Sequence, residues 1–217
     1  MYICSITLKK RRNMEYAAAI ISAIGAIITG LFGMWIKSNQ ATKDKITDLK
    51  IEKWKKEEEV KAKRRADNSA IIYNELHDIL RELNADRVYI VQPHPIGNES
   101  LLSIYYEIKR KGVEPMKPHI QNLKIPEVAK FAAEMVQERF MYITDIDEQV
   151  ADKYARSLLN RCGTTGAIIK RLSDNTHDWI GSIFCEFTGD MECKEEEARE
   201  VLHAAATNIQ YLLPEYK

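Results

Sequence analysis

The chain has 217 residues, with 32 basic and 32 acidic side chains, so its formal net charge is near zero. This balance does not favour a nucleic-acid-binding protein, whose domain is typically basic. Once an apolar N-terminal segment is set aside, the length suffices for one compact domain of about 150 residues but not for two.

The first feature in chain order is an apolar run at residues 16–36, which follows an N-terminal tail at residues 1–15. It contains no charged side chain, and Ser22 and Thr29 are its polar residues. At about 1.5 Å per residue, such a helix spans ~30 Å, the thickness of a bilayer's hydrocarbon core. We expect an uncleaved transmembrane helix, because the run exceeds the ~7–15 apolar residues of a signal peptide.

Small residues recur every fourth position along this run and continue on the adjoining ridge. Such spacing lets two helix backbones approach closely in lipid, where no hydrophobic force drives helices together. The sequence therefore predicts a self-association face, although small residues are also simply common in membrane helices. The predicted packing residues are Ala18, Ser22, Gly25, Ala26, Thr29, Gly30 and Gly33.

The orientation of this helix in the membrane stays open. Basic residues 9–12 precede the run and would hold the N-terminus inside, but seven Lys residues follow between positions 37 and 56. If Met14 rather than Met1 starts the chain, the first basic cluster is lost and the C-terminal part faces the cytoplasm.

Residues 37–67 form a charged stretch with no Pro or Gly. Its apolar positions are sparse, and its apolar heptads are incomplete. We expect a solvated helical stalk, with a short parallel coiled coil as the alternative.

Residues 68–217 have the pattern of one α+β domain. Apolar spacing predicts helices at 69–84, 125–140 and 194–213, and β-branched runs predict strands at 86–95, 101–112, 141–146, 164–173 and 179–189. The connection from 147 through 159 is helical or irregular. We expect one antiparallel sheet with helices on a face. The predicted inward residues are Ile72, Leu76, Ile79, Leu80 and Leu83 in the first helix, and Val128, Phe131, Ala132, Met135 and Val136 in the second.

No catalytic or metal-binding motif stands out in this domain. The stretch "RCGTTG" around Cys162 lacks the length and the lysine of a phosphate-binding loop, and we interpret it as a turn into a strand. The acidic stretch "TDIDEQVADKY" lacks the alternation and glycine of a calcium loop, so we interpret it as a solvated loop. We expect no enzyme activity, no cofactor and no metal.

The His and Cys residues leave two weaker possibilities. His94 lies between two prolines and could bind a ligand or metal with His119 or His177, but an exposed turn histidine is favoured. One pair among Cys162, Cys185 and Cys193 could form a disulfide in an oxidising compartment, and the sequence does not show which.

The order of elements resembles a minimal GAF-like domain: a helix, "ADRVYIVQPHP", "SIYYEIKRKGVEP", a helix, "FMYITDI", "GAIIKRL", "WIGSIFCEFT" and a closing helix. This resemblance implies one antiparallel sheet with helices on one side. It identifies no ligand and no binding residue.

The whole layout also resembles the holins of T-even phages, and "IGSIFCEFTGDMECKEEEAREVLHAAATNI" is similar to the ending of that family. This resemblance implies a short cytoplasmic N-terminus, one helix in the inner membrane of the host cell and a periplasmic domain. Such holins oligomerise to permeabilise the membrane and time host lysis, and an antiholin is the implied partner.

Two functions are therefore expected. The first is a phage holin-like protein that self-associates through its membrane helix, with the soluble domain as a regulatory or partner-binding module. The alternative is a membrane-anchored GAF-like sensor or ligand-binding protein whose domain is cytoplasmic. The basic stretch after the membrane run fits the alternative, since it could contact anionic lipid.

Overall fold

The computed structural model describes residues 49–213, and the chain divides into two compact units between Ala62 and Lys63. A first helix covers residues 49–82. The elements that follow are β1 (Arg87–Ile96), β2 (Glu99–Lys109), β3 (Leu123–Lys124), the 3-10 helix η1 (Ile125–Val128), α2 (Ala129–Gln137), β4 (Phe140–Ile143), α3 (Ile146–Gln149), α4 (Lys153–Arg161), β5 (Gly166–Ser173), β6 (Trp179–Phe187) and α5 (Glu195–Ile209).

The described part of the first unit is helical and exposed. Its helix carries charged pairs one turn apart, such as Glu52 with Lys56 at 2.8 Å and Glu58 with Lys61 at 3.2 Å. Each such exposed pair stabilises a helix by only about 0.2–0.5 kcal/mol. These residues fall in the predicted stalk.

No helix among residues 49–213 is long and apolar enough to cross a membrane. The predicted transmembrane helix at residues 16–36, with its packing residues from Ala18 to Gly33, lies outside the described residues.

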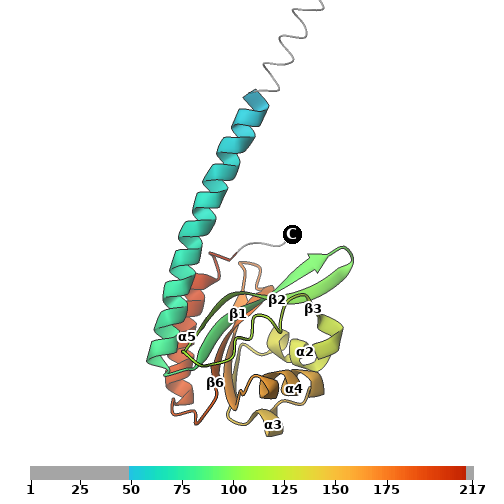
Figure 1. Cartoon of the computed structure of the whole chain (residues 1–217), viewed down its shortest axis with the longest axis vertical. Helices are drawn as coiled ribbons and strands as arrows, with labels where there is room; N and C mark the ends of the chain where they lie inside the picture. The colour runs from blue at the N-terminus through green and yellow to red at the C-terminus, as the bar shows by residue number, and fades with distance from the viewer. Residues whose placement is uncertain (1–48, 214–217) are drawn as a thin grey trace, which may run out of the picture. The chain divides into compact units, whose positions relative to one another are not determined.

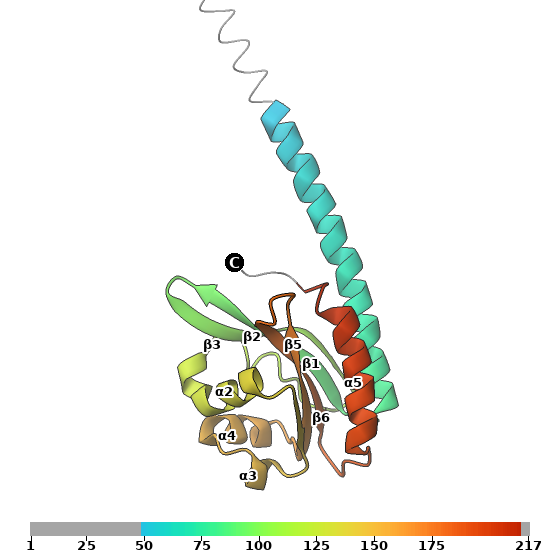
Figure 2. The same cartoon turned by 180° about the vertical axis from the view of Figure 1, so that it is seen from behind.

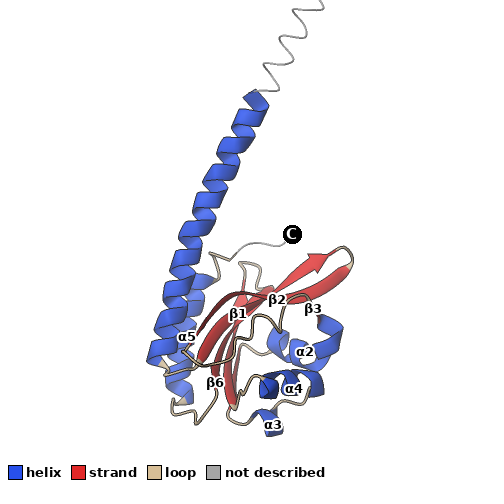
Figure 3. Cartoon of the chain, in the orientation of Figure 1, coloured by secondary structure: helices blue, strands red, loops and turns tan. Residues whose placement is uncertain are grey.

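The second unit contains a six-stranded antiparallel sheet in the order β3-β2-β1-β6-β5-β4. β1 lies near the centre, where Arg87 is opposite Glu186 of β6 and Lys109 of β2. The α+β class and the antiparallel sheet are as predicted. Figure 3 shows the sheet in red with blue helices around it.

Helices cover both faces of this sheet (Figures 1 and 2). Residues 72–83 and α5 pack on one face, and η1, α2, α3 and α4 pack on the other. The expectation of helices on one side is therefore wrong. The run "VYIV" in β1 explains why both faces are covered. Its consecutive apolar residues place Val88 and Ile90 on one face and Tyr89 and Val91 on the other, so both faces need a covering layer.

The predicted core positions of the helices are mostly buried. Ile72, Leu76, Ile79 and Leu83 are buried, as are Val128, Phe131, Ala132 and Met135. Val136 is 38% exposed, so its inward assignment is wrong. On a regular helix Val136 lies about 140° around the axis from Phe131, beyond the edge of the apolar stripe.

Candidate functional site

A small apolar cavity lies between the sheet and the layer formed by η1, α2 and α4. Its volume is ≈ 30 Å³. Every residue that lines it is apolar or aromatic: Tyr89, Val91, Leu102, Ile120, Leu123, Val128, Phe131, Met135, Ala155, Leu158, Leu159 and Phe184. An apolar lining of this kind leaves a trapped water without hydrogen-bond partners, so such a cavity stays dry.

Aromatic rings from the sheet and α2 form much of the cavity wall. Tyr89 of β1 and Phe184 of β6 are cross-strand partners, and their rings stack at 4.9 Å between centroids with 9° between planes. Phe131 of α2 approaches Phe184 at 6.2 Å. Stacked and tilted pairs at these separations favour a fixed ring arrangement.

Beside this wall lies a fully buried charged cluster. Arg87 and Glu186 face each other across β1 and β6, and Arg87 Nε donates to Glu186 Oε2 at 2.9 Å. Thr164 completes the cluster: Arg87 Nη2 donates to its Oγ1, which donates to Glu186 Oε2, both at 2.9 Å. The Tyr89 hydroxyl donates to Glu186 Oε1, and Arg87 Nη1 donates to the carbonyl oxygen of Glu114.

The titration behaviour of the cluster follows from this geometry. Burial acts to lower the pKa of Arg87, but the carboxylate of Glu186 and the neighbouring Tyr89 together outweigh it, and the pKa lies above its ordinary value. Burial and Glu186 together hold the pKa of Tyr89 well above its ordinary value. Arg87 therefore stays charged and Tyr89 stays a hydrogen-bond donor at neutral pH. Arg87 and Glu186 thus form an ion pair that is also hydrogen-bonded, as buried charges must be.

Asp152 ties together the two helices that cover the cavity. Its Oδ1 accepts from the backbone N–H of Tyr154 at 3.0 Å and of Ala155 at 3.1 Å, which caps α4. Its Oδ2 accepts from the N–H of Lys130 at 3.2 Å and of Phe131 at 3.4 Å in the first turn of α2. Burial raises the pKa of Asp152, but these four N–H groups outweigh it, so the pKa lies below its ordinary value.

The structure corrects the interpretation of the acidic stretch as a solvated loop. Asp152 is only 8% exposed and Asp145 caps α3 by accepting from the N–H of Asp147 and Glu148. Asp and Asn are preferred at helix N-caps because their side chains satisfy the free N–H groups there. The connection from 147 through 159 was expected to be helical or irregular, and α4 shows that its second half is helical.

His94 also differs from its prediction as an exposed turn residue. It lies within β1, is 8% exposed, and has Nε2 at 2.8 Å from Ser103 Oγ of β2. The strand simply continues through both prolines to Ile96. Among residues 49–213, no group of three or more His, Cys, Asp and Glu side chains could hold a metal.

The three cysteines of the described region are free thiols. Cys162 follows α4 in the predicted turn, and burial raises the pKa of its thiol. Burial likewise raises the pKa of Cys185, well above its ordinary value. A protonated, buried thiol is a poor nucleophile.

The charged cluster was not predicted from the sequence. Its signal was a single charged residue in each of two apolar strands, Arg87 before "VYIV" and Glu186 between Cys185 and Phe187. A lone charge inside a buried strand requires a partner. The sequence predicted strand ranges but no pairing between these two strands, so the two charges were not matched.

Comparison with solved structures shows a GAF-like fold. The PixJ GAF domain of Thermosynechococcus elongatus, in its blue-light absorbing form, matches with a TM-score of 0.56 and 16% identity, covering 69% of this chain and 86% of that chain. A GAF domain from Synechocystis in its photoproduct state matches with a TM-score of 0.54 and 14% identity, over 66% and 90% of the chains. The phycoerythrobilin-bound GAF domain of a cyanobacterial phytochrome matches with a TM-score of 0.52 and 15% identity, over 71% and 90%.

No family model and no curated protein matches the sequence. At 14–16% identity, these structural likenesses establish the fold and leave the ligand to the geometry of the site.

Proposed function

We propose that this protein is a membrane-anchored sensor whose GAF-like domain binds a small apolar molecule between the sheet and the α2 and α4 layer. The observation that carries the proposal is the apolar cavity inside a GAF-like fold. Solved domains with this fold include one that holds phycoerythrobilin, which supports a ligand-binding role. We infer binding rather than catalysis, since the cavity wall offers apolar side chains and no nucleophile.

The size of the cavity limits the ligand. A volume of ≈ 30 Å³ is close to the share of one water molecule in the liquid, whereas pockets for drug-sized ligands measure about 300–1,000 Å³. A ligand therefore enters only if α2 or α4 moves outward. Small apolar molecules require the least movement, and the Tyr89–Glu186 pair beside the wall fixes the sheet while the helices shift.

Native mass spectrometry of the full chain, released from a mild detergent, tests this proposal. We expect an additional bound mass on the wild-type protein. Ala155→Val fills the cavity and should abolish that mass. Ala205→Val is the matched control, because Ala205 is a buried helical alanine on the opposite face of the sheet. A wild-type chain without bound mass, or equal retention by both variants, would contradict the proposal.

A second candidate is the holin-like function, which the charge-free run at residues 16–36 favours. In this reading the membrane helices assemble through the ladder of small residues, and the GAF-like domain binds an antiholin or another regulator. Gly30→Leu would separate backbones that otherwise touch, whereas Ile20→Leu preserves volume and hydrophobicity.

Expression in a bacterial host separates the two candidates. A holin should stop respiration abruptly after a delay, and Gly30→Leu should postpone or abolish that event while Ile20→Leu leaves it unchanged. A sensor should be tolerated whatever occupies position 30. A reporter fused after Lys217 shows on which side of the membrane the C-terminus lies. A periplasmic C-terminus fits the holin, and a cytoplasmic one fits the sensor.

A further inference from the structure

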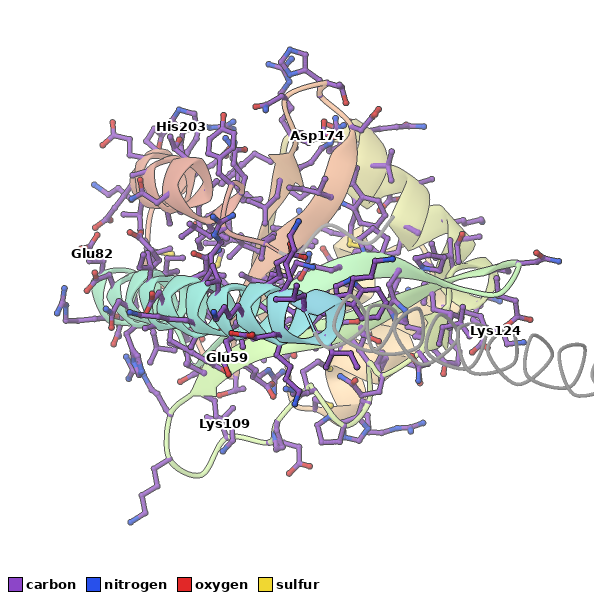
Figure 4. The ribbon with its side chains drawn as sticks, turned by 90° about the horizontal axis from the view of Figure 1, so that it is seen from above. Glu59, Glu82, Lys109, Lys124, Asp174 and His203 are labelled. Carbon is purple, nitrogen blue, oxygen red and sulfur yellow. The ribbon has the colours of Figure 1, made fainter. Side chains whose placement is uncertain are left out.

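A second hollow lies away from the apolar cavity, where α5 meets the edge of the sheet. Its volume is ≈ 220 Å³. It lies between the C-terminal half of α5, the start of β4, the end of β5 and the turn that joins β5 to β6. Figure 4 labels one residue on each of two of these elements, His203 on α5 and Asp174 in the turn, on the same side of the domain.

The lining of this cleft is strongly basic. Of its nine lining residues five are basic and none is acidic. The basic residues are Arg139, Lys170, Arg171, His177 and His203. This concentration stands out in a chain whose formal net charge is zero.

Three basic residues of the cleft have no carboxylate partner in the described part of the chain. Within residues 49–213, no ion pair within 4.0 Å involves Arg139, Lys170 or Arg171. Arg171 donates from Nη2 to the carbonyl oxygen of His177 at 2.7 Å, but its Nε is buried without a hydrogen-bond partner. Neighbouring Arg199, in contrast, pairs with Glu195 at 2.7 Å.

The acidic groups of the β5–β6 turn are engaged within the turn. Asp174 Oδ1 accepts from the N–H and the hydroxyl of Thr176, at 2.9 and 2.7 Å, and from the N–H of Asp178. Asp178 lies 2.9 Å from the same hydroxyl. Inside the cleft, burial and the charges of Arg199 and Arg139 lower the pKa of Lys170. Among residues 49–213, the positive charges of Arg139, Lys170 and Arg171 are therefore not paired with a carboxylate.

We propose that this cleft binds the phosphate group of a small phosphomonoester. Arg139, before β4, and Lys170, on β5, supply charge, and His203, Ser173 and Gln210 supply further hydrogen-bonding groups. A phosphomonoester carries about −1.5 to −2 charge at pH 7 and three strong acceptor oxygens, which suits several converging cations. The site is separate from the apolar cavity, so it does not depend on the proposed sensory function.

Isothermal titration of the full chain with inorganic phosphate, in a detergent that lacks phosphate, tests the proposal. We expect saturable binding at low salt with a Kd of about 1 mM or below, equivalent to ~−4 kcal/mol. Arg139→Gln and Lys170→Gln should each weaken binding about tenfold, as the loss of one charge-assisted hydrogen bond predicts. Lys109→Gln is the matched control, since Lys109 is an exposed lysine on β2 that does not line the cleft.

Arg139 is exposed, so its replacement leaves folding intact and a lost signal reports on binding. A parallel arm uses phosphatidylcholine vesicles with and without phosphatidic acid. Binding of free phosphate assigns a soluble ligand, and binding of phosphatidic acid vesicles alone assigns a lipid headgroup. The proposal is overturned if neither binds saturably, or if Lys109→Gln weakens binding as much as the two cleft variants.

Discussion

Charged side chains have different environments on the two faces of the sheet. On the face covered by α2 and α4, Arg87 and Glu186 are completely buried and are paired with each other, with Thr164 and with Tyr89. On the face covered by α5, Lys170 and Arg139 reach a cleft that water can enter, and they have no carboxylate partner within the described region.

This difference separates charges that hold the fold from charges that are free to bind. A buried ion pair loses much of its electrostatic gain to desolvation, but removing one partner leaves an uncompensated charge. A cation at the surface remains hydrated, so its removal costs the fold little. Stability measurements on single variants should therefore distinguish the faces clearly.

The largest effect is expected at the charged cluster. Glu186→Gln leaves Arg87 buried without its carboxylate and should reduce the free energy of unfolding by about 3–5 kcal/mol. Glu200→Gln, at an exposed carboxylate of α5, should change it by no more than ~0.5 kcal/mol. Urea unfolding of the full chain gives both values.

A double variant sharpens this prediction. Arg87→Met with Glu186→Leu removes both charges and should recover most of the lost stability, as buried pairs replaced by apolar residues often do. If the double variant is as unstable as Glu186→Gln, packing around the cluster, rather than charge, dominates.

A smaller effect is expected at Asp152. Asp152→Ala removes the N-cap of α4 and should cost about 0.5–2 kcal/mol, with an added loss from the exposed N–H groups of Lys130 and Phe131. Asp152→Asn keeps a capping oxygen and should cost less. Thermal unfolding at pH 7 ranks the two variants.

The pH dependence of this contribution follows from the lowered pKa of Asp152. Its stabilisation is fully present above the pKa of an unfolded aspartate, ~3.9, and is lost as the pH falls through the lower pKa of the folded state. The difference in unfolding free energy between wild type and Asp152→Asn should therefore shrink on acidification below pH ~4. A difference that is constant down to the lowest pH would show that the carboxylate charge is not involved.

The smallest effect on stability is expected in the basic cleft. Lys170→Met keeps the apolar stem and removes a charge that Arg139 and Arg199 repel, so the unfolding free energy should stay within ~0.5 kcal/mol or rise. Arg139→Gln, at an exposed position, should also stay within ~0.5 kcal/mol. If either variant lowers the free energy of unfolding by more than ~2 kcal/mol, the charge that it removes stabilises the fold, as the buried ion pair does.

Sequence patterns predicted the local structure better than the site. Periodicity located the strand that contains "VYIV" and the helix through Ile72, Leu76 and Ile79, because alternation and helical spacing are properties of neighbouring residues. Arg87 and Glu186 are 99 residues apart in the sequence, and they meet only because of the register between β1 and β6. The cleft likewise depends on how α5 packs beside β5. Tertiary relations of this kind leave no local pattern.

Amide hydrogen exchange tests the central claim, that the ligand binds on the α2 and α4 face. The full chain is compared before and after its bound molecule is removed by unfolding and refolding. Removal should speed exchange about tenfold in the first turns of α2 and α4, at Lys130, Phe131, Tyr154 and Ala155, because opening free energies fall when a ligand leaves. Identical exchange in both samples, or a change confined to α5, would contradict the account.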